Sequence, residues 1–325
     1  MANEIPLIEL YRARQRIHGM VRQTPLEHSP SLSARLGAPV YLKLESQQAT
    51  GSFKLRGASN AIAQLDDAQK TRGVVAASTG NHGRALAHAA RALGVPAVIC
   101  LSCLVPANKV EAIRALGAEV RIVGNSQDDA QAEAERIAHE RGAALLPPFD
   151  HPQIIAGQGT LGLEILEQLP QVRQVLVPLS GGGLFGGLAL ALKAADPSIR
   201  LHGISMRRGA AMAASLEAGR PVEVEERPSL ADSLGGGIGL DNRYTFDLAR
   251  AHCDELHLLD EAAIAAGIRH AYREERQVLE GAAAVGIAAL LEGKIAAEGP
   301  VVVVVSGRNI AIDQHQRIIE EAPHG

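Results

Sequence analysis

Short runs of β-branched residues alternate along the chain with segments that have the spacing of helices, and this alternation most constrains the fold. Residues 39–45, 73–78, 174–180 and 300–306 are examples of the runs, and the Ala- and Leu-rich segment 82–94 is one of the helical ones. A strand, a helix and a second strand in succession usually form a parallel pair. The sequence therefore predicts an α/β fold of open, twisted, mostly parallel sheets flanked by helices.

The chain of 325 residues exceeds the usual size of one hydrophobic core, so two lobes are expected. No repeat, low-complexity tract or proline-rich linker divides the sequence, which indicates that the second lobe is inserted within the first. The clearest change of composition lies around residues 147–152. We expect a large domain of residues 1–50 and 149–325, with a small domain of residues 51–148 inserted in it.

The charge and hydropathy of the chain exclude two classes of partner. A formal net charge of −4 gives no basic field of the kind that attracts nucleic acid. The first residues contain scattered charges and no apolar run, and the aliphatic stretch 301–305 is far too short to span a membrane. We expect a cytoplasmic protein that binds neither nucleic acid nor membrane.

Lys54 is the first candidate for chemistry, because it follows Phe53 at the start of a predicted helix. Burial lowers the pKa of a lysine, and a neutral amine can attack an aldehyde. Phe53 could stack on an aromatic ring. A single lysine near a helix start is usually a solvated surface residue, so this motif needs support from others.

A loop that contains Ser78, Thr79, Asn81 and His82 lies between a predicted strand and a predicted helix. Backbone N–H groups and hydroxyls at such a junction can converge on an anion such as a carboxylate. The alternative is an ordinary helix cap, for which Ser, Thr and Asn are preferred.

A glycine-rich loop follows the predicted strand 174–179 and precedes another helix. It contains Gly181, Gly182, Gly183 and Leu184, a place where exposed N–H groups and the helix dipole hold phosphate. The same loop fits the dinucleotide pattern GxGxxG, which requires an acidic residue about 20 positions later at the end of the next strand. That strand ends in Ser205 and Met206. A monophosphate is therefore a better ligand than a dinucleotide.

Together these motifs indicate a site for pyridoxal 5′-phosphate (PLP) bearing an amino acid. The segments SFKLRGA, STGNHG, SGGGLFGG, LEGAAAVGIAAL and VVSGRN occur in the order and at the approximate spacing of the serine/threonine dehydratase family of fold-type-II PLP enzymes. The chain resembles this family over nearly its whole length. The resemblance implies the tryptophan synthase β-like fold, PLP as cofactor, and a homodimer.

The resemblance also implies roles for single residues. Lys54 would bind the cofactor covalently and act as the catalytic base, Phe53 would pack on it, and Asn81 would bind its ring hydroxyl. Gly181, Gly182, Gly183 and Leu184 would bind its phosphate, and Ser306 would face the pyridine nitrogen. Ser78, Thr79, Asn81 and His82 would line the surface for the substrate carboxylate. The implied reaction is α,β-elimination of water from a β-hydroxy amino acid, which gives a 2-oxo acid and ammonia.

Several positions depart from the family pattern. Thr79 replaces the second serine of serine racemases, and Met206, Arg207 and Arg208 stand where metal-activated relatives carry acidic ligands, so no metal site is expected there. Arg308 replaces a small residue, and it either turns to solvent or binds an anionic group. The glycine-rich segment Ser233 to Gly239 suggests a reshaped substrate side. The end of the chain at Gly325 leaves no room for a regulatory domain, so isoleucine feedback is not expected.

The segments SMRRGAAM and SLGGGIGLDNRYTF are most similar to the dehydratase branch associated with hydroxyectoine utilisation. Threonine and serine are the default substrates, while 3-hydroxyaspartate, phenylserine and a hydroxyectoine-derived amino acid stay open. Serine racemisation and β-replacement by a thiol are alternative reactions of the same fold. A ligand-binding protein without activity is a third alternative, against which the presence of Lys54 argues.

Overall fold

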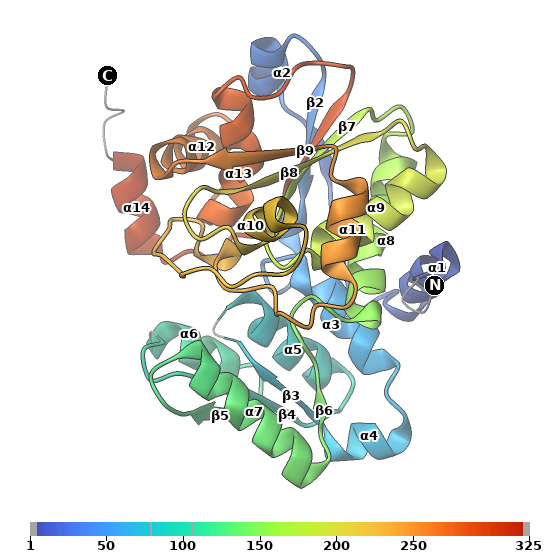
Figure 1. Cartoon of the computed structure of the whole chain (residues 1–325), viewed down its shortest axis with the longest axis vertical. Coiled ribbons are helices and arrows are strands. Elements are labelled where there is room, and N and C mark those ends of the chain that lie inside the picture. The colour runs from blue at the N-terminus through green and yellow to red at the C-terminus, as the bar shows by residue number, and fades with distance from the viewer. Residues whose placement is uncertain (1–4, 79, 106, 321–325) are drawn as a thin grey trace.

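The computed structural model describes residues 5–78, 80–105 and 107–320, without the side chains of residues 107–109. Two sheets form its framework, and Figure 1 shows them one above the other, each wrapped by helices. Thr79, one of the predicted substrate residues, lies outside the described residues.

The larger sheet has six strands in the order β1-β2-β10-β7-β8-β9. Their bounds are β1 Leu26–His28, β2 Val40–Leu44, β7 Gln174–Pro178, β8 Arg200–Met206, β9 Glu255–Leu259 and β10 Val301–Val305. All neighbouring strands are parallel except β1 and β2. Every residue of β10 is buried, as expected for a strand that is covered on both faces.

Helices cover both faces of the larger sheet, and the valines of β10 alternate between them. Val301, Val303 and Val305 pack in the core formed with α12 and α13, whereas Val302 and Val304 pack in the core formed with α8 and α9. The helices of this part are α1 Leu7–Arg16, α2 Pro30–Leu36, α8 Pro152–Gln168, α9 Gly183–Ala195, α10 Ala211–Ala218, α11 Thr245–His252, α12 Glu261–Arg273, α13 Gly281–Leu291 and α14 Ile312–Glu320.

The smaller sheet has four parallel strands in the order β5-β4-β3-β6. They are β3 Val74–Ala77, β4 Ala97–Leu101, β5 Glu119–Ile122 and β6 Ala144–Leu145. One face packs mainly against α3 and α5, and the other packs against α7. The helices here are α3 Lys54–Ala63, α4 Asp67–Arg72, α5 Asn81–Ala92, α6 Ala107–Arg114 and α7 Gln127–Arg141.

These two helix-flanked sheets confirm the predicted α/β fold. All four strands of the smaller sheet lie in the sequence between β2 and β7 of the larger one. The division of the chain into domains at residues 50/51 and 148/149 stays a prediction. In the described part of the chain, no helix combines the length and the hydropathy that a membrane span requires.

The chain passes from the larger sheet to the smaller one through a short 3₁₀ helix, η1 (Glu45–Gln47), and α3. A buried ionic network holds α3 in place. The Arg56 guanidinium donates to Glu45 (2.8 Å) on η1 and to Glu164 (2.6 Å) on α8, and Lys43 on β2 donates to Glu164 (2.7 Å). Burial opposes ionisation of Glu45, but Arg56 outweighs this effect and lowers the pKa of the carboxyl. The helix that begins at Lys54 is therefore tied to both sheets.

Candidate functional site

Lys54 is the first residue of α3, and no described carboxylate forms an ion pair with its amine. Nζ donates a hydrogen bond to the carbonyl oxygen of Pro148 (2.8 Å) and lies 5.2 Å from the centre of the Phe53 ring. Burial lowers the pKa of Lys54 to about 8, against the attraction of Glu280. A large fraction of the amine is therefore neutral near pH 8, which is the nucleophilic form.

The segment before Lys54 pairs with the segment that follows β10. Phe53 N donates to Ser306 O (3.1 Å), Arg308 N donates to Gly51 O (2.9 Å), and Ser52 and Gly307 form an antiparallel bridge. Ser306 is buried, and among the described residues its hydroxyl has no hydrogen-bond partner. The lysine motif and the carboxy-terminal motif thus form one unit at the end of the central strand.

Asn81 joins this unit through two side chains. Its Nδ2 donates to Glu280 Oε1 (2.8 Å), and its Oδ1 accepts from Asn309 Nδ2 (2.5 Å). Glu280 Oε2 in turn accepts from Asn309 N (3.0 Å). Glu280 is buried at the start of α13 and acts electrostatically on Lys54. Glu280 belongs to the motif LEGAAAVGIAAL but was not predicted as a site residue, although an acidic residue directly before a long apolar helix was a usable signal.

Ser78 and His82 lie on either side of the start of α5. Ser78 Oγ accepts a hydrogen bond from Gly83 N (3.0 Å), so this hydroxyl braces its own loop. His82 is buried, and its Nε2 lies 2.9 Å from Leu146 O. Burial and the nearby Lys54 lower the pKa of His82 to about 4, so the imidazole is neutral at pH 7. His82 can therefore offer a hydrogen bond but no positive charge to a carboxylate.

The glycine loop has the geometry of an anion site. Gly182 has a left-handed backbone (φ 84°) and caps α9, which begins at Gly183. Within the part of the chain that the structure describes, no hydrogen bond uses the N–H groups of Gly181, Gly182, Gly183 or Leu184. Unpartnered N–H groups at a helix N-terminus carry partial positive charge and favour phosphate.

The absence of side chains at the glycines also leaves room for Phe149, a contact that the sequence did not reveal. A Cβ atom at Gly181 would lie 2.3 Å from the Phe149 ring, and one at Gly183 would lie 3.0 Å from Phe149 Cα. Phe149 directly follows Pro148, whose carbonyl accepts from Lys54. The dipeptide Pro148-Phe149 therefore contacts both the lysine and the glycine loop.

Two features that depart from the family pattern lie near this unit. The Arg308 side chain is exposed, and its charge lowers the pKa of Arg84, which burial already lowers. The glycine-rich segment follows Leu230, whose carbonyl lies 2.1 Å from the position of a Cβ on Gly281. The segment thus begins beside the start of α13, next to Glu280.

The residues that the structure brings together fit PLP. A lysine amine of lowered pKa can react with its aldehyde, and free N–H groups can hold its phosphate. The hydroxyl of the buried residue Ser306 has no other partner among the described residues. The hydrogen bonds described above connect the motifs of Lys54, Asn81, Glu280 and Ser306, and Phe149 contacts the glycine loop.

Comparisons with known proteins agree with this site. Residues 17–307 match the family model described as "Pyridoxal-phosphate dependent enzyme". A Sinorhizobium fredii protein named "Putative threonine dehydratase" is 60% identical over 318 residues, which cover 98% of this chain and 96% of that protein. The L-threonine ammonia-lyase of Thermotoga maritima is 41% identical, with 98% and 79% of the two chains covered. Maize serine racemase has a similar structure, with a TM-score of 0.91, 34% identity and 96% of each chain covered.

Proposed function

We propose that this chain, which belongs to the pyridoxal-phosphate dependent enzyme family, is a dehydratase that removes water and ammonia from a β-hydroxy amino acid of the threonine and serine type. Membership of the family implies PLP as the cofactor. The observation that carries the proposal is the lowered pKa of Lys54 at about 8, in a unit that also contains Asn81, Ser306 and Glu280.

In this proposal Lys54 binds the cofactor and Phe53 packs against it. The N–H groups of Gly181, Gly182, Gly183 and Leu184 hold its phosphate, Asn81 binds its ring hydroxyl, and Ser306 faces its ring nitrogen. When bound, PLP supplies an electron sink for the electron pair released at the substrate Cα. A serine hydroxyl, unlike a carboxylate, cannot stabilise a positive charge on the ring nitrogen, so this sink is weak. A weak sink favours rapid loss of the β-substituent.

Different residues of the chain would carry out different steps of the elimination. Ser78, Thr79, Asn81 and His82 orient the substrate carboxylate. The neutral Lys54 amine takes the proton from the substrate Cα, which a group of pKa about 8 can do near neutral pH. Loss of the β-hydroxyl and later hydrolysis of the released enamine give the 2-oxo acid and ammonia. His82, held neutral by burial, keeps a second positive charge away from Lys54.

The finer assignment of the substrate rests on sequence features. Similarity of SMRRGAAM and SLGGGIGLDNRYTF to the hydroxyectoine-utilisation branch supports a hydroxyectoine-derived amino acid, while the names of the relatives support threonine. The glycine-rich segment after Leu230, beside α13, supports a substrate side different from that of ordinary threonine dehydratases. Serine racemisation is the second candidate, because maize serine racemase has the same fold. We further propose that the protein is a cytoplasmic homodimer.

The test combines a spectrum with product analysis. We expect the purified protein to carry a visible absorption band and to release 2-oxo acid and ammonia from one member of a panel containing threonine, serine, 3-hydroxyaspartate, phenylserine and hydroxyectoine-derived amino acids. Lys54→Ala should abolish the 2-oxo acid, whereas Lys70→Ala on α4 should not. A band with D-serine or a thiol adduct as the product would move the assignment to racemisation or β-replacement. Absence of a band would refute the cofactor site.

A further inference from the structure

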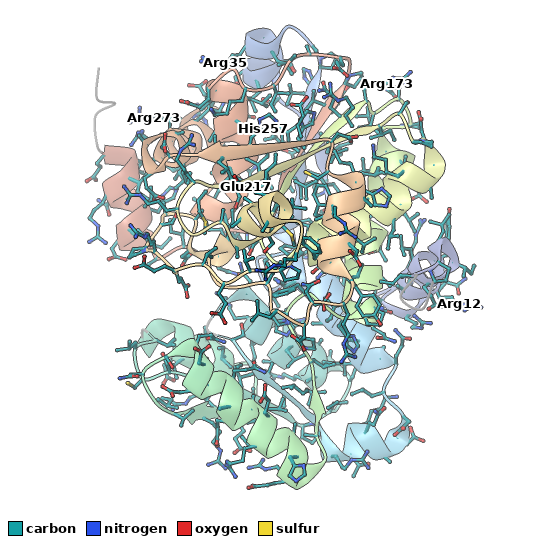
Figure 2. All side chains as sticks on the ribbon, in the orientation of Figure 1. Arg12, Arg35, Arg173, Glu217, His257 and Arg273 are labelled. Carbon is teal, nitrogen blue, oxygen red and sulfur yellow. The ribbon has the colours of Figure 1, made fainter. Side chains whose placement is uncertain are left out.

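A cluster of two histidines and one glutamate lies on the larger sheet, away from the lysine site. His202 is the third residue of β8, and Glu255 and His257 lie on β9, the strand at the edge of the sheet. His202 pairs with Glu255 in the strand register, which places the cluster near the amino-terminal ends of both strands. Figure 2 labels His257 on β9.

Three ligand atoms of the cluster lie close to one another. His202 Nδ1 lies 3.2 Å from His257 Nε2, His257 Nε2 lies 3.2 Å from Glu255 Oε2, and His202 Nδ1 lies 3.6 Å from the same Oε2. Zinc binds nitrogen and oxygen ligands at about 2.0–2.2 Å with tetrahedral geometry, which places neighbouring ligand atoms about 3.3–3.5 Å apart. The triangle therefore matches one face of a zinc tetrahedron.

The surroundings of the three atoms also suit a metal ion. Burial lowers the pKa of His202 to about 4 and also lowers that of His257, so both imidazoles are neutral at pH 7, the form that binds metal. Glu255 Oε1 pairs with Arg200, which leaves Oε2 as a single ligand. The Glu255 side chain is 40% exposed, so an ion and a water as fourth ligand can enter from solvent.

The Gln174 amide fixes which nitrogen of His202 carries the proton when no metal is bound. Gln174 Nε2 lies 3.2 Å from His202 Nε2, and the Gln174 amide is oriented by bonds to Ala296 O and Glu298 N. His202 Nε2 therefore accepts, and Nδ1 carries the proton on the side of His257 Nε2 and Glu255 Oε2. His257 Nε2 can in turn donate a hydrogen bond to Glu255 Oε2, which lies 3.2 Å away. A metal ion bound to the three atoms would take the place of these two N–H protons beside Glu255 Oε2.

We infer that His202, Glu255 and His257 bind one zinc-class divalent ion, which fastens the edge strand β9 to β8. Metal on Nδ1 moves the His202 proton to Nε2, so Gln174 must turn its amide to present oxygen, at the loss of its bonds to Ala296 and Glu298. The Lys294 charge also acts on His257 and opposes a cation. Replacement of Lys294 by Ala should therefore tighten binding.

The test uses full-length holoenzyme that has been treated with chelator and titrated with Co²⁺, which substitutes for zinc and absorbs visible light when four-coordinate. We expect one Co²⁺ per chain, with absorption at wavelengths beyond the cofactor band, and displacement by Zn²⁺. His257→Gln should abolish this absorption. His270→Gln is the matched control, because His270 Nε2 also lies beside a carboxylate, Glu275 (3.3 Å), but has no second histidine in the cluster around it.

The denaturation temperature is a second readout, which distinguishes loss of the metal site from misfolding of a variant. Zn²⁺ should raise the denaturation temperature of the unmodified protein and of His270→Gln, but not that of His257→Gln or of the more exposed Glu255→Gln. Circular dichroism and lyase activity should be unchanged in both cluster variants, because the cluster lies near the amino-terminal ends of β8 and β9, whereas the lysine unit follows the carboxy-terminal end of β10. Absence of stoichiometric Co²⁺ absorption in the unmodified protein, or its retention in both cluster variants, would overturn the inference.

Discussion

Lys54 differs from an ordinary lysine in the charge that it carries near neutral pH. Burial lowers its pKa to about 8, and Glu280 opposes the shift. Attachment of PLP to apoenzyme requires the neutral amine, so we expect the rate to rise with pH and level off above a midpoint of about 8. Stopped-flow absorbance across a pH series would measure this midpoint.

Glu280→Gln tests the cause of that midpoint. Removal of the carboxylate removes the attraction that favours the charged amine, so the midpoint should move to lower pH. Glu274→Gln, near the end of α12, is the control and should leave the midpoint unchanged. A midpoint near that of free lysine in the unmodified protein would contradict the buried environment described for Lys54.

His82 provides a second test at the same scale. Its pKa of about 4 results mainly from burial, with a contribution from Lys54. We expect its ring signals in a histidine NMR titration to stay in the neutral form as the pH falls from 8 to about 5. Protonation of His82 near pH 6.5 would show that the site is more open to water than the structure indicates.

At the scale of elements, α3 depends on the buried ionic network. Arg56→Met would leave Glu45 and Glu164 buried without their main partner, so we expect the free energy of unfolding to fall by about 3–5 kcal/mol. Urea denaturation would measure the loss. Arg114→Met removes only an exposed pair with Glu111, and pairs of this kind contribute about 0–1 kcal/mol. Equal losses in the two variants would show that the network does not stabilise α3.

The contact between the glycine loop and Phe149 can be tested by a double-mutant cycle. Gly181→Ala should destabilise the protein and weaken PLP binding, because its Cβ would overlap the Phe149 ring; such overpacking costs about 1–3 kcal/mol. Adding Phe149→Ala should recover part of this loss by making room. Unfolding and PLP titration would be compared across the four proteins. Strictly additive losses would contradict the contact.

The sequence predicted those parts of the site that depend on local pattern. The lysine, asparagine and glycine loops stand at the starts of α3, α5 and α9, because strand-to-helix junctions have recognisable composition. Glu280 and Phe149 were missed as site residues because their importance comes from partners far away in the sequence, Asn81 and Gly181. Ser78 and His82 were predicted to contact substrate, but their bonds within the protein could not be foreseen from their neighbours.

For the whole molecule, the cofactor should act as a stabilising ligand. A ligand at 100 times its dissociation constant adds about 2.7 kcal/mol to the free energy of unfolding. We expect removal of PLP to lower the denaturation temperature, and its return to restore it. Lys54→Ala should reduce this difference, whereas Lys70→Ala should not. Calorimetry of apo and reconstituted protein would measure it, and identical curves would argue against a site that is ordered by PLP.

Lys54 donates a hydrogen bond to Pro148, which lies in the segment that connects β6 of the smaller sheet to α8 of the larger part. Attachment of a cofactor to the amine would therefore affect this connecting segment. A lysine that has bonded to a cofactor has fewer protons to donate, so the Pro148 carbonyl must find another donor. Phe149, one residue later, packs on the loop expected to hold the phosphate. One short stretch of backbone would thus contact both the end of the cofactor that is bound to Lys54 and the loop that holds its phosphate.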